Sequence, residues 1–278
     1  MPFSRPLPPA PLSFWHSKTA IVTGASGGLG LAIAQALASA GANVVLAART
    51  RETLEAAAAK LSGLPGRAVP FVCDVTRDED VDNLIRQTVE QFGKLDALIN
   101  NAGLSVRKKL IDSTPDDFRS LMELNLLATV RTTRAAVPHL LATRGHLVNI
   151  GSLSGKAATR WLGAYPASKF AVTAYTQQLR LELGPEGLHV MLVCPGPIAR
   201  DDERVRSPEE LASLPESARK PGGGVKTNRI RPEALAAKIL TACERRKPEL
   251  VVPWYARIVF TLMQTSPTLA DWLVRKLT

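Results

Sequence analysis

A tyrosine and a lysine four residues apart are the side chains of this sequence best suited to acid–base chemistry. Tyr165 and Lys169 lie in the run Tyr-Pro-Ala-Ser-Lys, and residues 164–183 have the Ala, Leu, Gln and Glu content of a helix. Residues i and i+4 share one face of a helix. A lysine ammonium beside a phenol favours the phenolate and lowers the tyrosine pKa from about 10. The pair could therefore exchange a proton near neutral pH, although chance spacing on a surface helix is the commoner origin of such a pattern.

A glycine-rich turn near the N-terminus has the composition of a phosphate-binding loop. Residues 18–23 are a short β-branched run, residues 29–40 are rich in Ala and Leu, and residues 42–48 form a second apolar run. This order predicts a βαβ unit with a parallel sheet. Glycines in the turn between strand and helix let backbone N–H groups approach a pyrophosphate at the helix N-terminus. The residues that we expect to contact a dinucleotide here are Gly24, Ser26, Gly28, Leu29 and Gly30.

The end of the second predicted strand bears on the choice between NAD and NADP. A carboxylate at this point would hydrogen-bond the adenosine ribose, but the sequence has Ala48 and Arg49, with Arg51 beyond. An arginine can bind a 2′-phosphate through two hydrogen bonds, whereas an acidic side chain would repel it. The sequence therefore favours NADP, and the alternative is that Arg49 is simply solvated.

The alternation of strands and helices continues to about residue 252. Further strands are predicted at 68–73, 95–99, 145–150, 188–194 and 249–252, and further helices at 51–61, 80–92, 115–140, 164–183 and 232–245. This alternation predicts an α/β fold with a parallel sheet. Ligands bind outside the carboxyl ends of the strands in such sheets. The residues at those ends that we expect to line the site include Asn101, Ala102, Gly103, Ser152, Pro195, Gly196 and Ile198.

Several short motifs, in the right order and spacing, resemble the short-chain dehydrogenase/reductase family over residues 18–252. They are Thr23-Gly24-Ala-Ser-Gly-Gly28-Leu-Gly30, Asn100-Asn-Ala-Gly103, Asn125, Ser152, Tyr165-x-x-x-Lys169 and Pro195-Gly-Pro-Ile198. The resemblance implies one Rossmann-type domain, a doubly wound parallel sheet flanked by helices, that binds NADP(H). It also implies that Asn125, Ser152, Tyr165 and Lys169 form a catalytic tetrad.

The resemblance gives each member of the tetrad a role. Ser152 would hydrogen-bond the substrate's carbonyl oxygen, where negative charge develops, and Tyr165 would protonate it. Lys169 would lower the tyrosine pKa and reach the nicotinamide ribose. Asn125 would hold a water that feeds a proton path to the lysine. The activity implied is the interconversion of a ketone or aldehyde and an alcohol by hydride transfer.

The resemblance also assigns cofactor contacts outside the tetrad. Asp74 and Val75 would lie at the adenine, Asn101 at the adenosine ribose and Ile198 at the carboxamide. One position departs from the family pattern, because Arg200 stands where similar enzymes usually have a threonine that contacts the cofactor. That single contact is therefore in doubt, whereas the tetrad is not.

The substrate is less well defined than the chemistry. The pocket residues that we expect are Ser152, Trp161, Leu162 and Tyr165, together with a mobile surface loop at 199–229. These residues are mostly apolar, and the basic, amphipathic C-terminus resembles that of family members that act on lipids and steroids. The expected substrate is therefore an apolar carbonyl compound, similar to a lipid, a steroid or a xenobiotic. The alternative function is a non-catalytic NADP-binding module with a regulatory or scaffold role, and the complete tetrad argues against it.

The two ends of the chain lie outside the predicted catalytic domain, residues 18–252. Residues 1–17 are rich in proline and predict a flexible arm. Residues 253–278 place apolar side chains at helical intervals between cations. This pattern favours a packing helix in a homodimer or homotetramer, and the alternative is a peripheral membrane contact.

Composition indicates which ligands, metals and cellular locations to expect. The formal net charge of +10 suits an anionic ligand, and the absence of a nucleic-acid-binding signature predicts no nucleic-acid partner. The three cysteines are scattered without metal-ligand spacing, so we expect no metal site and a reducing compartment. Since the sequence has neither an evident signal peptide nor a long apolar run, a cytoplasmic location is expected, with membrane contact at most peripheral.

Overall fold

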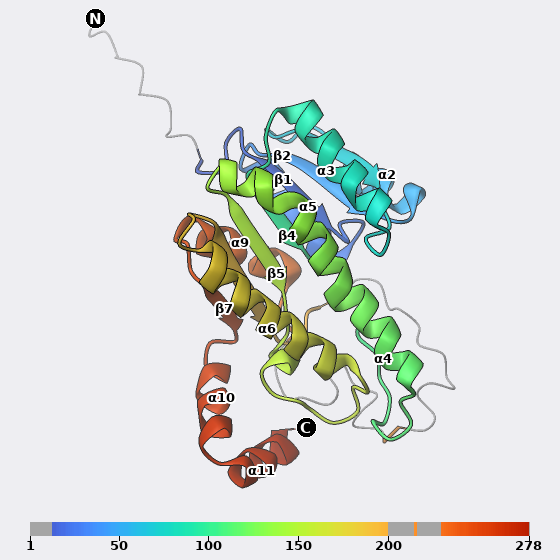
Figure 1. Cartoon of the computed structure of the whole chain (residues 1–278), viewed down its shortest axis with the longest axis vertical. Coiled ribbons are helices and arrows are strands. Elements are labelled where there is room, and N and C mark those ends of the chain that lie inside the picture. The colour runs from blue at the N-terminus through green and yellow to red at the C-terminus, as the bar shows by residue number, and fades with distance from the viewer. Residues whose placement is uncertain (1–12, 200–213, 216–228, 278) are drawn as a thin grey trace, which may run out of the picture.

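Seven parallel strands form a single sheet in the order β3-β2-β1-β4-β5-β6-β7 (Figure 1). The structure is a computed structural model that describes residues 13–199, 214–215 and 229–277, so most of the predicted loop 199–229, including Arg200, lies outside the described residues. The strands are β1 (Thr19–Thr23), β2 (Asn43–Ala48), β3 (Ala68–Val72), β4 (Ala97–Asn100), β5 (His146–Ile150), β6 (His189–Pro195) and β7 (Glu249–Val252). The chain starts mid-sheet, runs out to β3, crosses back to β4 and continues to β7. This doubly wound order confirms the predicted fold class.

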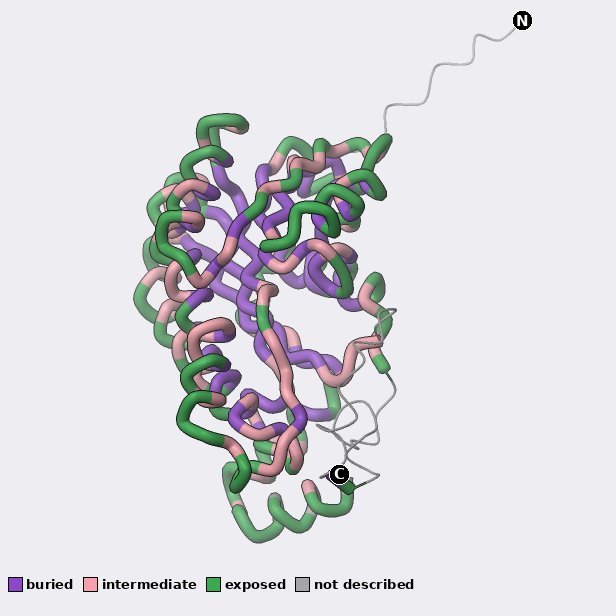
Figure 2. The backbone as a smooth tube through the Cα atoms, turned by 90° about the vertical axis from the view of Figure 1, so that its right-hand side faces the viewer, coloured by how far each residue is buried: buried purple, intermediate pink, exposed green. Residues whose placement is uncertain are grey.

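Helices cover both faces of the sheet. The helices α1 (Gly28–Ser39), α2 (Arg51–Ala59) and α9 (Pro232–Glu244) pack on one face, and α3 (Asp78–Phe92), α5 (Ala128–Ala142) and α6 (Tyr165–Leu183) pack on the other (Figure 1). A parallel sheet covered on both sides needs apolar residues at successive positions. In β5, Val148 belongs to the core layer beneath α1 and α9, and its neighbour Leu147 to the layer beneath α3 and α5. Figure 2 accordingly shows the strands as a buried centre between more exposed helices.

The helical stretch before β5 contains a change of pitch at Asn125. It begins as α4 (Pro115–Met122), widens into a π-helical turn, η1 (Glu123–Leu127), and continues as α5. The start of α4 is fixed by a capping box, in which Thr114 and Asp117 each accept a hydrogen bond from the other's backbone N–H. The sequence predicts one uninterrupted helix over 115–140, whereas the structure shows two α-helices joined by this π-helical turn. Single π-helical turns inside α-helices are frequent at functional sites.

The N-terminal segment is packed where the sequence predicts a flexible arm. Residues 13–17 form a turn, and Trp15 within it is 1% exposed. The Trp15 ring lies against His146 at the start of β5, with 5.4 Å between the ring centroids. The remainder of the predicted arm, residues 1–12, lies outside the described residues.

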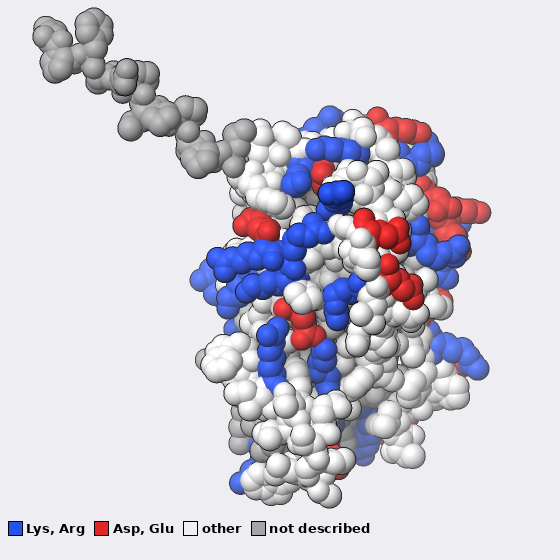
Figure 3. Space-filling model, turned by 60° about the vertical axis from the view of Figure 1, so that its left-hand side comes forward, with Lys and Arg blue, Asp and Glu red and all other residues white. Residues whose placement is uncertain are grey.

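The C-terminal residues form a helical hairpin that extends away from the sheet (Figures 1 and 2). It consists of α10 (Ala256–Thr265) and α11 (Pro267–Leu277). Ala256 and Phe260 pack against the domain, next to Val251 and Leu153. The lower part of the face in Figure 3, at the height of this hairpin, is mostly uncharged. Large apolar side chains are exposed on the hairpin and on the two residues just before it. They are Trp254, Tyr255, Ile258, Leu262, Leu269 and Trp272.

A helix needs about 20 predominantly apolar residues to cross a bilayer. Across residues 13–199, 214–215 and 229–277, no helix is both long enough and apolar enough to span a membrane.

Candidate active site

The four predicted tetrad residues come from three elements at the carboxyl edge of the sheet. Asn125 comes from the π-helical turn, Ser152 from the turn directly after β5, and Tyr165 and Lys169 from the start of α6. The α6 helix starts at Tyr165 with Pro166 in its first turn, where a proline's fixed φ favours helix initiation. The Tyr165–Lys169 spacing therefore falls on one helix face, as predicted.

Lys169 is a buried cation at the centre of this site. Its side chain is 6% exposed, and Nζ donates a hydrogen bond to the carbonyl oxygen of Ile150 at the end of β5 (2.8 Å). Nζ also lies 6.0 Å from the centroid of the Tyr165 ring. Burial lowers the pKa of Lys169 from 10.5 to about 8, against a smaller raising effect of Cys194. The lysine is thus mostly charged at neutral pH, and it releases its proton far more readily than an exposed lysine.

Asn125 ties the loop after β4 to α6. Its Oδ1 accepts a hydrogen bond from Leu104 N (2.8 Å), and its Nδ2 donates to Leu104 O (3.0 Å) and to Ser168 Oγ (2.9 Å). Ser168 Oγ in turn donates to the carbonyl oxygen of Tyr165 (2.8 Å). Both amide hydrogens of Asn125 are therefore used. A water held at Asn125 would have to bond an oxygen lone pair, on the side chain or on the backbone carbonyl.

Gly103 lies beside both Asn125 and Lys169 in space, and this position accommodates only a glycine. A Cβ at Gly103 would lie 2.8 Å from Asn125 Oδ1 and 3.6 Å from Lys169 Nζ. A side chain there would displace Asn125 from its hydrogen bonds and cover the lysine. Gly103, which the sequence predicts as a cofactor contact, keeps the approach to the lysine open.

Ser152 is held by its own backbone. Its Oγ accepts a hydrogen bond from Ser154 N (3.1 Å) and caps the short 3-10 helix η2 (Leu153–Gly155). Because a hydroxyl both accepts and donates, this contact fixes the oxygen while its hydrogen can still rotate toward a ligand. The arrangement suits a hydrogen-bond donor to a carbonyl oxygen.

The glycine turn after β1 has the shape of a phosphate cradle. Gly24 and Gly28 have φ of +64° and +53°, a region that favours glycine. A Cβ at Gly30 would clash with the carbonyl oxygen of Gly24, whereas a Cβ at Gly27 or Gly28 would meet nothing within 4 Å. The residue that precedes α1, Gly27, has no side chain to cap the helix. The first N–H groups of α1 are therefore available to an anion such as a pyrophosphate.

Thr23 and Asn101 lock this turn to the end of β4. Thr23 Oγ1 accepts hydrogen bonds from the backbone N–H groups of Asn101 and Ala102 (3.0 Å each). Asn101 Nδ2 donates to the carbonyl oxygens of Thr23 (2.9 Å) and Gly24 (3.2 Å). The sequence predicts Asn101 and Ala102 as cofactor contacts, but it gives Thr23 no role of its own. The available signal is a hydroxyl on the last residue of a strand, directly before the glycine turn.

The adenine end of the predicted site carries opposite charges. Arg49 is exposed after β2, and Val75 is buried after β3. Burial raises the pKa of the Asp74 carboxyl, but hydrogen bonds from Thr76 and the charges of Arg49 and Arg77 outweigh it, so the pKa lies below its usual value. Asp74 is therefore ionised, and the exposed Arg49 is close enough for its charge to act on that carboxylate.

The segment after β6 is held by backbone contacts to the end of β7 and to Ile230. Gly196 directly follows the last residue of β6, Pro195. Its backbone N–H donates a hydrogen bond to the carbonyl oxygen of Val252 at the end of β7 (2.7 Å). Ile198 forms a parallel bridge with Ile230, at the two described borders of the predicted loop. These contacts hold the segment beside the carboxyl ends of β6 and β7.

The predicted pocket residues differ in what they expose. Leu162 is 8% exposed, and its backbone forms a parallel bridge with Lys108. Trp161 is half-buried with φ of +68°, and the Arg160 guanidinium lies 6.0 Å from its ring centroid. Trp161 thus offers more surface to a substrate than Leu162 does.

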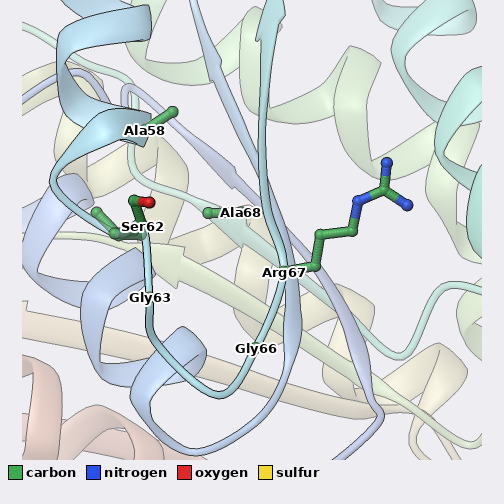
Figure 4. Close-up of a pocket in the computed structure, with 7 residues that line it drawn as sticks. Ala58, Ser62, Gly63, Gly66, Arg67 and Ala68 are labelled. Atoms are coloured by element: carbon green, nitrogen blue, oxygen red, sulfur yellow. The ribbon is translucent and has the colours of Figure 1, made fainter.

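A separate hollow lies at the opposite edge of the sheet. It encloses about 380 Å³ between the end of α2 and the start of β3. In Figure 4 the Arg67 side chain extends away from Ser62 and Ala68, so the hollow is lined mainly by small groups. It holds no acid–base pair, and the tetrad lies at the other ends of the strands. Its lining residues are Ala58, Leu61, Ser62, Gly63, Gly66, Arg67 and Ala68.

Comparisons with known proteins agree with this geometry. The family model for short chain dehydrogenase matches residues 18–210. An uncharacterized oxidoreductase of Staphylococcus aureus is 42% identical over 180 residues, 64% of this chain and 77% of that protein. An L-fucose dehydrogenase of Bos taurus is 40% identical over 185 residues, 66% and 67% of the two chains. The crystal structure of L-sorbose reductase from Gluconobacter frateurii, complexed with NADPH and L-sorbose, has a TM-score of 0.73 at 26% identity and covers 87% of this chain and 96% of that one.

Proposed function

Since this chain belongs to the short-chain dehydrogenase family, we propose that it is an NADP(H)-dependent oxidoreductase that interconverts a ketone or aldehyde and an alcohol. The observation that carries the proposal is the buried Lys169, whose pKa is lowered to about 8, on the same helix face as Tyr165. Burying a lysine is unfavourable unless the position has a use.

NADP(H) is the proposed cofactor because the chain's own groups fit it. The open cradle at Gly27 and Gly28 and the uncapped start of α1 suit a pyrophosphate. The exposed Arg49 suits a 2′-phosphate. When bound, the cofactor supplies or accepts the hydride. The resemblance to a reductase solved with NADPH supports the same choice.

The tetrad would handle the proton of the reaction. In the reductive direction, Ser152 donates a hydrogen bond to the substrate oxygen, and Tyr165 transfers its phenolic proton to that oxygen. The ammonium of Lys169 stabilises the phenolate that remains. In the oxidative direction the same phenolate removes the proton from the alcohol. Asn125 acts as a positioning residue, because it holds Ser168 and the loop after β4 around the lysine.

The proposed substrate is an apolar carbonyl compound. Trp161 offers a half-buried ring, and Phe260 of α10 packs against the same small apolar cluster as Leu153 and Leu126, the residues that follow Ser152 and Asn125. This shared cluster supports an apolar wall beside the proposed site. Two similar proteins carry the names of sugar enzymes, so polyols and sugars belong in the same substrate panel.

The test is NADPH oxidation by the full-length chain with apolar ketones, aldehydes and sugars, comparing wild type with Tyr165→Phe. The variant should bind NADPH as tightly as wild type, measured by fluorescence titration, and should lose at least about 100-fold in turnover. Undiminished turnover would refute the role of Tyr165. If wild type binds NADPH but turns over no compound of the panel, the non-catalytic module becomes the better explanation.

A further inference from the structure

Three side chains that can ligate a metal meet at the amino ends of β5 and β6. His146 and His189 begin those strands and are direct register partners, so both side chains lie on the same face of the sheet. Cys243, at the end of α9, belongs to the core layer on that face. One ligand atom from each of the three lies within 4.8 Å of the other two, and all three residues are buried. This cluster is separate from the tetrad, which lies at the carboxyl ends of the strands.

We propose that His146, His189 and Cys243 form a binding site for a divalent cation of the zinc type. Two imidazole nitrogens and one thiolate are a donor set that zinc prefers, at about 2.0–2.3 Å from the ion. Atoms within 4.8 Å of one another can close around such an ion by side-chain rotation. The fourth position of a tetrahedral ion would be taken by a water.

His189 is already oriented as a ligand. Its Nε2 lies 2.9 Å from the carbonyl oxygen of Lys247, and because a carbonyl only accepts, Nε2 carries the proton. Its Nδ1 is therefore a lone pair, and it lies 2.8 Å from His146 Nδ1. Histidines that ligate metals commonly donate their other N–H to a backbone carbonyl, which fixes the tautomer and the ring. This contact directs the His189 lone pair into the cluster, where it accepts the N–H of His146 Nδ1 in the metal-free site. A bound ion would replace that hydrogen bond, and the His146 proton would move to Nε2.

Two cations lie near the cluster. The charges of Arg246 and Lys18 act on His146, and the charge of Arg246 also acts on His189. Because these charges oppose an added ion, the negative charge of a Cys243 thiolate is needed to offset them.

Binding must release one proton per ion. Cys243 is a free, buried cysteine, so the unloaded site holds a thiol. The thiol loses its proton to solvent as the sulfur–metal bond forms. Each imidazole keeps one proton on its other ring nitrogen, and the ion changes no oxidation state. The balance is therefore one ion bound and one proton released, with any further proton coming from a bound water.

The surroundings indicate a structural ion. The rings of Phe14 and Trp15 pack on His146, with centroid distances of 5.7 and 5.4 Å, and cover the cluster. An ion here would join the starts of β5 and β6 to the end of α9. It would stabilise the native state by binding it and not the unfolded chain. It would leave the carboxyl edge, and hence turnover, unaffected.

The test uses the full-length chain without a histidine tag, with one metal-free sample dialysed against Zn²⁺ and a separate one against Co²⁺ as a spectroscopic probe. We expect one ion per chain, a sulfur-to-cobalt charge-transfer band, release of one proton and a higher melting temperature with zinc. His189→Gln and Cys243→Ala should each weaken binding by at least about 100-fold, since even indirect partners of a metal are worth about 10–100-fold. His139→Gln and Cys73→Ala are the matched controls outside the cluster and should bind as wild type does.

Two results would overturn the site. One is a wild-type chain that takes up neither metal at micromolar free concentration. The other is binding that survives in both His189→Gln and Cys243→Ala, which would place the ion elsewhere. If those variants fail to fold, the wild-type cobalt spectrum decides, because a bound ion without the charge-transfer band excludes Cys243.

Discussion

The two edges of the sheet both bury polar groups, but they use them differently. At the carboxyl edge, Lys169 and Asn125 bond backbone groups of the strand ends and loops, and glycines keep space open beside them. At the amino edge, Asp96 accepts a hydrogen bond from Thr19 N (2.8 Å) and lies 3.3 Å from Lys94 Nζ and 3.7 Å from Lys18 Nζ. These contacts at the amino edge hold the start of β1 beside the start of β4.

The difference follows from the path of the chain. Successive crossovers leave the carboxyl ends of β1 and β4 in opposite directions, which opens a crevice between them. Polar groups around that crevice remain within reach of a ligand. At the amino edge the segment at residues 13–17 covers the strand starts, and Trp15 fills the space. Substitutions at the carboxyl edge should therefore reduce activity, and substitutions at the amino edge should reduce stability.

The largest effect is expected from Lys169→Met. Turnover should fall by at least about 100-fold, because the phenolate of Tyr165 loses its stabilising charge. Stability should change in the opposite direction, since the variant no longer buries an ammonium. At pH 7 we expect the free energy of unfolding to rise by about 1–3 kcal/mol, less than the full value of the pKa shift because the bond to Ile150 is also lost. Urea denaturation beside turnover assays measures both.

The change of stability with pH tests the lowered pKa of Lys169. The unfolded chain keeps the lysine proton up to about pH 10.5, whereas the folded chain loses it near pH 8. Between these values the unfolded state binds more protons, so wild-type stability gains a contribution that grows with pH from about 8 to 10.5. Lys169→Met should lack this rise, and Lys60→Met, at an exposed lysine, should retain it. A rise of equal size in both variants would contradict the lowered pKa of Lys169.

Arg49→Asp tests the open side of the carboxyl edge. Because Arg49 is exposed, we expect the range of a charge-assisted hydrogen bond, about 1.5–3 kcal/mol, to be lost from NADPH binding and little from NADH binding. Isothermal titration with both cofactors measures the difference. Arg86→Asp on α3 is the control for a change of net charge. Equal weakening of both cofactors would mean that Arg49 does not read the 2′-phosphate.

Asp96→Ala tests the amino edge. It leaves the buried N–H of Thr19 without its acceptor and separates Lys18 and Lys94 from their shared carboxylate, so about 1–3 kcal/mol of stability should be lost. Turnover of the folded fraction should stay within about twofold of wild type. Asp96→Asn keeps an acceptor for Thr19 and should lose less. A large fall in turnover without loss of stability would remove the proposed division between the edges.

Local patterns predicted most of what surrounds the chemistry. The glycine turn and the Tyr165–Lys169 pair depend on neighbours within one turn of chain, so their spacing is visible in the sequence. The apolar runs of the strands are equally local, because a sheet covered on both faces needs them. The π-helical turn at Asn125 is not local in this sense. A helix pattern looks alike whether or not one extra residue is inserted, so the sequence predicts an uninterrupted helix there.

Contacts that depend on strand register were beyond the sequence. His146 and His189 become neighbours only because β5 and β6 align their first residues, and Cys243 joins them only when α9 packs on that face. Their wide separation along the chain has none of the short spacing by which metal ligands are usually identified. The sequence predicts a flexible arm around Trp15 because prolines dominate its surroundings, whereas the structure shows its ring buried in the core at the amino edge.

The smallest effect on turnover is expected at the C-terminal hairpin, which belongs to neither edge. Ile258 and Leu262 are exposed on α10, and we propose that they contact a second copy of the chain. Ile258→Glu combined with Leu262→Glu should shift sedimentation toward the monomer and leave turnover within about twofold, because charges are strongly disfavoured at the core of an interface. Thr261→Glu with Gln264→Glu adds the same charge at exposed polar positions of the helix, and should sediment as wild type does.

Flotation with anionic vesicles distinguishes a membrane contact from a contact between two copies of the chain. If the hairpin binds lipid, the Ile258→Glu and Leu262→Glu double variant should lose that binding, while wild type and variant are both monomeric. A wild-type chain that is monomeric and does not float would contradict both interfaces. It would leave the packing of Phe260 near Leu153 as the hairpin's contribution, a wall of the substrate pocket.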